Sequence, residues 1–165
     1  MAYLLDTSIL IEAKDRYYGL EFCPAFWDWL AESAAAGTVY SIQKVADELD
    51  RRDDELRAWA RGSGSAIFRP FAPNIADTQR RVSEWATGSS RYIPGAAAMF
   101  LNKADYFIVA QALGAGDTVV SAEVPSGARK KIKIPDACQA FNIPFKNTFE
   151  MLRAERARFV LPGPR

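Results

Sequence analysis

The sequence contains no histidine, and this absence removes several kinds of enzyme at once. Triads with a histidine base, cysteine–histidine pairs, histidine-dependent ribonucleases and nearly all zinc hydrolases need an imidazole that this chain does not supply. If the protein is an enzyme, its carboxylates must therefore carry the chemistry.

The chain is also poor in cysteine, in net charge and in long apolar runs. Its two cysteines, Cys23 and Cys138, are far apart, which indicates buried thiols rather than a disulfide framework or a zinc knuckle. A net charge of +1 neither suggests nor excludes a polyanionic partner. The N-terminus lacks the features of a signal peptide, and no apolar run approaches the ~20 residues that a membrane helix needs. We therefore expect a cytoplasmic protein with no membrane partner.

The length of 165 residues, 49% of them hydrophobic, suits one domain over residues 1–165. Strand-like segments at 3–6, 38–42, 66–71 and 118–122 alternate with segments of helical spacing. Thr7 or Ser8 is expected to cap the helix that follows the first strand. This alternation predicts an α/β fold with a mostly parallel central sheet and helices on both faces.

Four carboxylates interrupt the apolar pattern. Asp6 stands between two apolar runs, where a buried carboxylate costs several kcal/mol unless it is paired or bound to a cation. Glu123 follows the strand at 118–122, Glu48 borders an apolar helix stripe, and Asp105 takes a core-facing position near a helix start. Taken singly, each acid is more simply explained as a helix cap or an ion-pair partner.

Taken together, the four acids favour a different interpretation. Parallel sheets place ligands beyond the C-terminal ends of their strands, near the point where the strand order reverses, so the four acids are expected to converge there. Four adjacent carboxylates do not remain ionised without cations between them, and an oxygen-only cluster suits Mg²⁺ or Mn²⁺.

Two other motifs of phosphate chemistry are absent. A haloacid-dehalogenase-type phosphotransferase needs a second aspartate two positions after the first, where this chain has Ser8. A P-loop needs GxxxxGK[ST], which the sequence does not contain.

The acids and their surroundings resemble the ordered motifs of the PIN domain. LLDTSILIE, VADEL, ADYFIVAQAL and TVVSAE correspond to that family's LLDTN, its helical glutamate, its DxxI segment and its VTxD strand end, over residues 3–125. The phrases EAKDRYY, FWDWL and NTFEMLR are similar to those of an uncharacterised PIN-like bacterial branch. PIN domains are three-layer α/β/α sandwiches and metal-dependent nucleases, and many of them, including the VapC-like toxins, cut RNA.

The resemblance implies that Asp6, Glu48, Asp105 and Glu123 are the catalytic acids and the ligands of Mg²⁺ or Mn²⁺. Glu123 stands where the family usually has an aspartate. Because its side chain is longer, it is expected to bind the metal through a water molecule. 

The family's frequent asparagine after the Asp-Thr pair is Ser8 in this chain. Thr7, Ser8 and Ser121 are expected to orient Asp6 through hydrogen bonds.

Basic residues near the acids offer a path for a phosphate backbone. The KKIKIP segment (130–135) alternates charge with isoleucine, so we expect a strand on which Lys131 and Lys133 share one face. The candidate RNA-binding residues are Lys130, Lys131, Lys133, Arg51 and Arg52. A solubilising face on an edge strand explains the same lysines equally well.

These observations lead to two hypotheses. The first is a metal-dependent endoribonuclease, a hydrolase that leaves 5′-phosphate and 3′-hydroxyl ends. The resemblance further implies a toxin–antitoxin role, an antitoxin protein as partner and a homodimer. The second is a PIN-fold binding or regulatory module with weak or no nuclease activity, which the glutamate at position 123 motivates.

Overall fold

A parallel sheet forms the centre of the protein, for which the computed structural model describes residues 1–164. The strands are β1 (Tyr3–Leu5), β2 (Val39–Ile42), β3 (Phe68–Arg69), β4 (Thr118–Val120) and β5 (Phe145–Lys146), in the order β3-β2-β1-β4-β5. Leu4 of β1 pairs with Tyr40 on one side and with Val119 on the other. The strand order reverses between β1 and β4, and this is where such sheets place their ligands.

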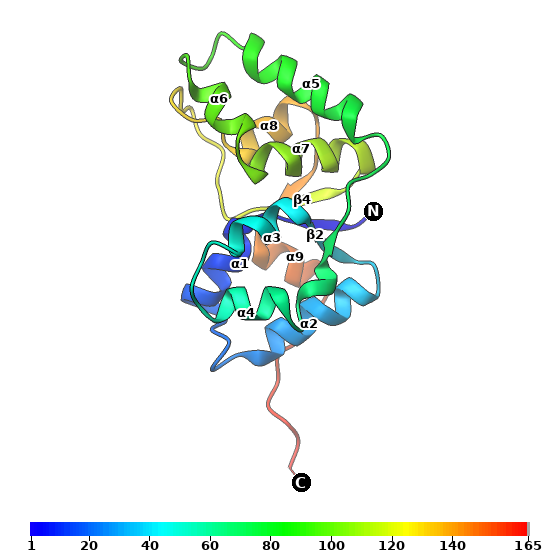
Figure 1. Ribbon diagram of the computed structural model, residues 1–165. Coiled ribbons are helices and arrows are strands. Elements are labelled where there is room, and N and C mark those ends of the chain that lie inside the picture. Colours follow the sequence, from blue (N-terminus) through cyan, green and yellow to red (C-terminus); the bar gives the residue numbers. More distant parts are fainter. Residues whose placement is uncertain (165) are drawn as a thin grey trace.

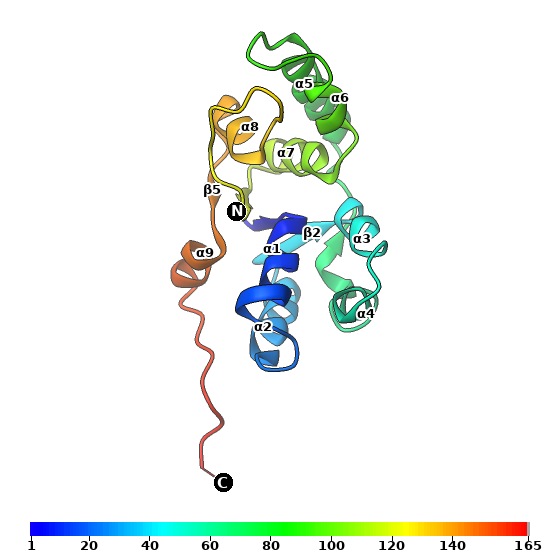
Figure 2. The same ribbon diagram turned by 90° about the vertical axis from the view of Figure 1, so that its left-hand side faces the viewer.

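Helices cover both faces of the sheet, so the expected three-layer α/β/α sandwich is confirmed (Figures 1 and 2). One face carries α7 (Ala104–Ala115) and α8 (Ile134–Ala140), with α5 (Ile75–Gly88) and α6 (Ala96–Leu101) packed over α7. The other carries α1 (Thr7–Glu12), α2 (Pro24–Ala35), α4 (Glu55–Arg61) and α9 (Thr148–Ala154).

Three further helices lie within the described residues. Helix α3 (Gln43–Leu49) directly follows β2 and contacts both α1 and α7. A π-helix, η1 (Ala13–Tyr17), extends α1, and a 3-10 helix, η2 (Ser65–Ile67), leads into β3. No helix within residues 1–164 combines the length and the apolar character that crossing a membrane requires.

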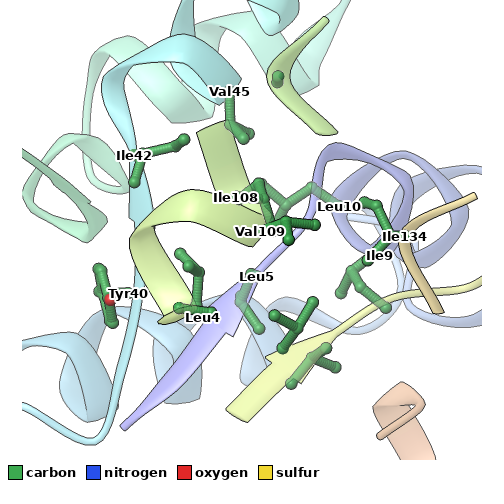
Figure 3. Packing of buried hydrophobic residues seen from close by; sticks show 14 of the residues in the cluster. Leu4, Leu5, Ile9, Leu10, Tyr40, Ile42, Val45, Ile108, Val109 and Ile134 are labelled. Carbon is green, nitrogen blue, oxygen red and sulfur yellow. The ribbon is translucent and has the colours of Figure 1, made fainter. Parts of the chain in front are cut away.

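Residues of β1 and α7 form the middle of the core. Leu4 and Leu5 of β1 and Ile108 and Val109 of α7 are fully buried and belong to one apolar cluster (Figure 3). Because α5 covers the outer side of α7, this helix is enclosed on two sides, and its apolar residues extend around most of its surface. Its tight enclosure fixes the first turn of α7, where Asp105 lies.

Several local predictions are wrong. The KKIKIP segment is not a strand: residues 131–133 form an irregular loop, and Ile134 begins α8, so Lys131 and Lys133 share no strand face. Both isoleucines are buried as the alternation suggested, but a loop that enters a helix at Pro135 buries them equally well.

Other differences concern element ends. The strand expected at 66–71 shrinks to β3, the short strand β5 was not predicted, and α9 ends at Ala154. Asp6, rather than Thr7 or Ser8, is the N-cap residue of α1, and its side chain makes no cap hydrogen bond. The Asp6 side chain instead accepts hydrogen bonds from Ser8 and Ser121.

Candidate active site

A cleft of about 480 Å³ lies beside the strand-order reversal, and all four predicted acids line it. Asp6 directly follows β1, Glu48 lies on α3, Asp105 lies in the first turn of α7, and Glu123 follows β4. Four separate elements thus bring these carboxylates together, as expected for the C-terminal ends of parallel strands.

Two serine hydroxyls hold Asp6. Ser8 Oγ donates to Asp6 Oδ2 at 2.6 Å, and Ser121 Oγ donates to the same oxygen at 2.9 Å. Asp6 Oδ1 has no side-chain donor within residues 1–164. Asp6 is buried, and this burial raises its pKa, while the hydrogen bonds from Ser8 and Ser121 oppose the rise.

The two serines also connect Asp6 to the segment after β4. Ser8 Oγ accepts a hydrogen bond from the Ala122 amide at 3.1 Å, and Ser121 Oγ accepts one from the Glu123 amide at 3.1 Å. The structure therefore places Ser8 and Ser121 where the sequence predicted them, against the Asp6 carboxylate.

Thr7 contacts a different acid from the one predicted. Its hydroxyl donates to Glu48 Oε2 at 2.7 Å, and the Ala104 amide donates to Glu48 Oε1 at 3.0 Å. Because Thr7 begins α1, its side chain points toward α3 instead of back toward Asp6. Glu48 thereby joins α1 to the start of α7 and has both oxygens occupied by protein donors.

Asp105 is the acid with the most open carboxylate. Neither of its oxygens accepts a hydrogen bond from a residue within 1–164. Burial raises the pKa of Asp105 to about 7, and the negative charges of Asp6, Glu123 and Glu48 add to the rise. The other three acids of the cleft thus all act on Asp105 through their charge.

Glu123 lies at the other side of the cleft and is held at both oxygens. Lys131 Nζ donates to its Oε1 at 3.1 Å, and the Ile134 amide at the start of α8 donates to Oε2 at 3.1 Å. The lysine and the helix start therefore fix the glutamate from two directions.

The predicted basic residues divide into two groups. Lys131 and Arg51 line the cleft. Arg52 instead pairs with Asp54 at 2.6 Å, and neither Lys130 nor Lys133 is among the residues that line the cleft.

The sequence interpretation missed Asn102 and Lys103, which also line the cleft. Lys103 is the residue that precedes α7, so knowing where this helix begins would have placed it beside Asp105.

The donor atoms suit a hard divalent cation, since every acid in the cleft offers oxygen ligands. No set of three or more His, Cys, Asp or Glu side chains within residues 1–164 is arranged so that it could hold a metal ion. In the cleft, Glu48 and Glu123 accept hydrogen bonds at both oxygens. Asp6 and Asp105 remain, and Mg²⁺ is commonly bound by one or two carboxylates while it keeps several waters. The residues present therefore fit such an ion.

The fold and its strand order define a PIN-like α/β protein. A solved structure, that of FitAB bound to the IR36 DNA fragment, contains a similar chain with a TM-score of 0.50 and 19% sequence identity. The similarity covers 88% of this chain and 94% of that chain, and it concerns the fold alone. The chain belongs to the family described as a domain of unknown function, DUF4411, whose profile matches residues 3–159. No curated protein matches the sequence.

Proposed function

We propose that this protein is a divalent-metal-dependent endoribonuclease. One observation carries the proposal: four carboxylates from four elements line a single cleft at the strand-order reversal. Burial, together with the charges of Asp6, Glu123 and Glu48, raises the pKa of Asp105 to about 7, and a cation bound in the cleft would favour its ionised form.

Different side chains of the cleft would have different roles in phosphodiester hydrolysis. Asp6, whose Oδ1 has no side-chain donor within residues 1–164, and Asp105 would hold the ion, and Ser8 and Ser121 fix the Asp6 carboxylate in place through its Oδ2. A bound Mg²⁺ or Mn²⁺ supplies an activated water and neutralises charge at the scissile phosphate. 

Arg51 and Lys103, at the cleft wall, would attract the phosphate backbone of the RNA. The chain needs no histidine for any of these tasks.

The partners belong to the same proposal. FitAB is bound to DNA in its solved structure, which supports nucleic acid as a partner class for this chain. RNA as the substrate, an antitoxin protein and a homodimer follow from the PIN resemblance. The toxin role predicts that expression of the chain alone arrests bacterial growth and that Asp6→Asn relieves the arrest.

A binding or regulatory module is the second candidate. The absence within residues 1–164 of three acids arranged for a metal favours it, because a weak site would bind metal and cut RNA poorly.

RNA cleavage with Mg²⁺ or Mn²⁺ separates the two candidates. We expect the wild type to cut RNA, and Asp6→Asn and Asp105→Asn to lower the rate by about 100-fold or more, since a metal ion supplies several kcal/mol of transition-state stabilisation. The control is Asp47→Asn, an exposed acid on α3 that does not line the cleft. A wild type that cuts neither RNA nor DNA with either ion would replace the nuclease with the binding module.

A further inference from the structure

The acids of the cleft fall into two pairs that differ in how their oxygens are used. Asp6 and Asp105 keep oxygens free of side-chain donors within residues 1–164, whereas Glu48 and Glu123 accept hydrogen bonds at both oxygens. A site for two metal ions needs carboxylates with open oxygens on both sides of the reacting phosphate, because its ions lie about 4 Å apart. In this cleft the oxygens on the Glu123 side are occupied by protein donors.

One of the donors to Glu123 is itself a cation. Lys131 lines the cleft, and its side chain is 44% exposed, so it is accessible from the solvent. Lys131 Nζ lies 3.1 Å from Glu123 Oε1, and Asp105 and Asp6 line the same cleft. The ammonium therefore lies in the field of three of the four acids.

The residues next to Lys131 and the Glu123 side chain hold Lys131 at the cleft. Ile132 is buried, which anchors the loop against the core and leaves Lys131 on the cleft side. The length of Glu123 matters as well, because its carboxylate spans from the Lys131 ammonium to the Ile134 amide. An aspartate at this position is one methylene shorter, so the same backbone would not bring its carboxylate to both donors.

We propose that Lys131 supplies the second positive charge of this site, so that the cleft holds one divalent ion, on Asp6 and Asp105. Glu123 is then a positioning residue that holds Lys131, and it is not a metal ligand. The ammonium is a compact point charge suited to a non-bridging oxygen of the substrate phosphate. This inference rests on the proposed nuclease function and specifies how the charges of its site are supplied.

Calorimetric titration of the full chain with Mn²⁺ tests the proposal through binding alone. We expect one Mn²⁺ per chain for the wild type. Lys131→Met removes a cation beside the acids, so it should tighten Mn²⁺ binding on the order of tenfold or admit a second ion. Lys131→Arg keeps the charge and should restore the wild-type affinity and stoichiometry. Lys130→Met makes the same charge change at the neighbouring residue, which does not line the cleft, and should bind Mn²⁺ as the wild type does.

Glu123→Gln distinguishes positioning from ligation. As a positioning residue, Glu123 can lose its charge while one Mn²⁺ per chain remains. The Glu123→Gln and Lys131→Met changes should also be non-additive, because they remove one ion pair.

The outcomes separate this inference from the nuclease proposal. Two Mn²⁺ per wild-type chain, a Lys131→Met variant that binds Mn²⁺ like Lys130→Met, or loss of Mn²⁺ binding in Glu123→Gln would each overturn the role of Lys131 and leave the nuclease standing. One Mn²⁺ per chain with the expected variant pattern, but without RNA cleavage, would support the one-ion site and refute the nuclease. A wild type that binds no Mn²⁺ refutes both.

Discussion

Replacing Asp105 with asparagine should stabilise the metal-free protein at alkaline pH. Asp105→Asn keeps the shape of the side chain and removes a charge that burial and three neighbouring acids oppose. An acid whose pKa is higher in the folded state than in the unfolded chain destabilises the fold once the pH exceeds its unfolded pKa. The asparagine carries no such penalty.

The size of the effect follows from the two pKa values of Asp105. The pKa rises from 3.8 to about 7, and about 3 pH units correspond to about 4 kcal/mol at 1.36 kcal/mol per unit. Asp105 is only half-buried and lines the cleft, so screening by solvent halves this to about 2 kcal/mol. For a chain of this size, about 2 kcal/mol shifts the Tm by about 4–8 °C.

Thermal unfolding in EDTA measures this difference between Asp105→Asn and the wild type. At pH 8 the variant should melt higher, and its advantage should shrink as the pH falls from about 7 toward 3.8, where Asp105 becomes protonated in both states. Mn²⁺ at 100 times its Kd should then raise the stability of the wild type by about 2.7 kcal/mol and that of the variant far less.

The control for this measurement is Asp47→Asn, which removes the same charge from an exposed position on α3. It should leave the Tm nearly unchanged at either pH. An Asp105→Asn protein that melts at or below the wild type at pH 8 in EDTA would refute the reasoning, because Asp105 would then not be a repelled charge.

Three further changes probe other parts of the molecule. Asp54→Ala removes the side-chain cap of α4 and should lower the free energy of unfolding by about 1 kcal/mol in urea titration. The Arg52 hydrogen bond lowers the pKa of Asp54 to about 2, so its contribution should be lost as the pH falls from 3.8 to about 2. Tyr40→Phe leaves one oxygen of the buried Asp117 without its hydroxyl donor, and should cost about 1–3 kcal/mol of stability in the same assay. Ser121→Ala, which removes a donor to the carboxylate at residue 6, should weaken Mn²⁺ binding by about 10-fold in calorimetry without preventing folding.

The sequence was sufficient to predict the layers and the four acids because both depend on which residues are buried. Alternation of strands and helices gives a parallel sheet, and an acid such as Asp6 inside an apolar run is conspicuous in any such pattern. Asp105 was found in the same way, from its core-facing position on a helix.

The contacts between side chains were harder to predict, because they depend on where elements begin and how they point. Thr7 contacts Glu48 because it begins α1, and a one-residue change in the helix start would turn it elsewhere. Lys131 was placed on a strand because Ile132 and Ile134 alternate, although a loop entering a helix buries the same pair. The ion pair between Lys131 and Glu123 follows from that loop, and nothing in the spacing of the two residues indicates it.

The central position of β1 determines when this site can exist. The first strand of the chain lies between β2 and β4, and Ser121 must be in place before the Asp6 carboxylate has both of its hydroxyl donors. During synthesis on a ribosome, β1 therefore remains without one of its neighbours until residues 118–120 emerge. Lys131 and Ile134 come later still, so a nascent or prematurely truncated chain carries the acids without the arrangement that makes them a site. Such pairing of distant segments also slows folding, which lengthens the interval between translation and an assembled cleft.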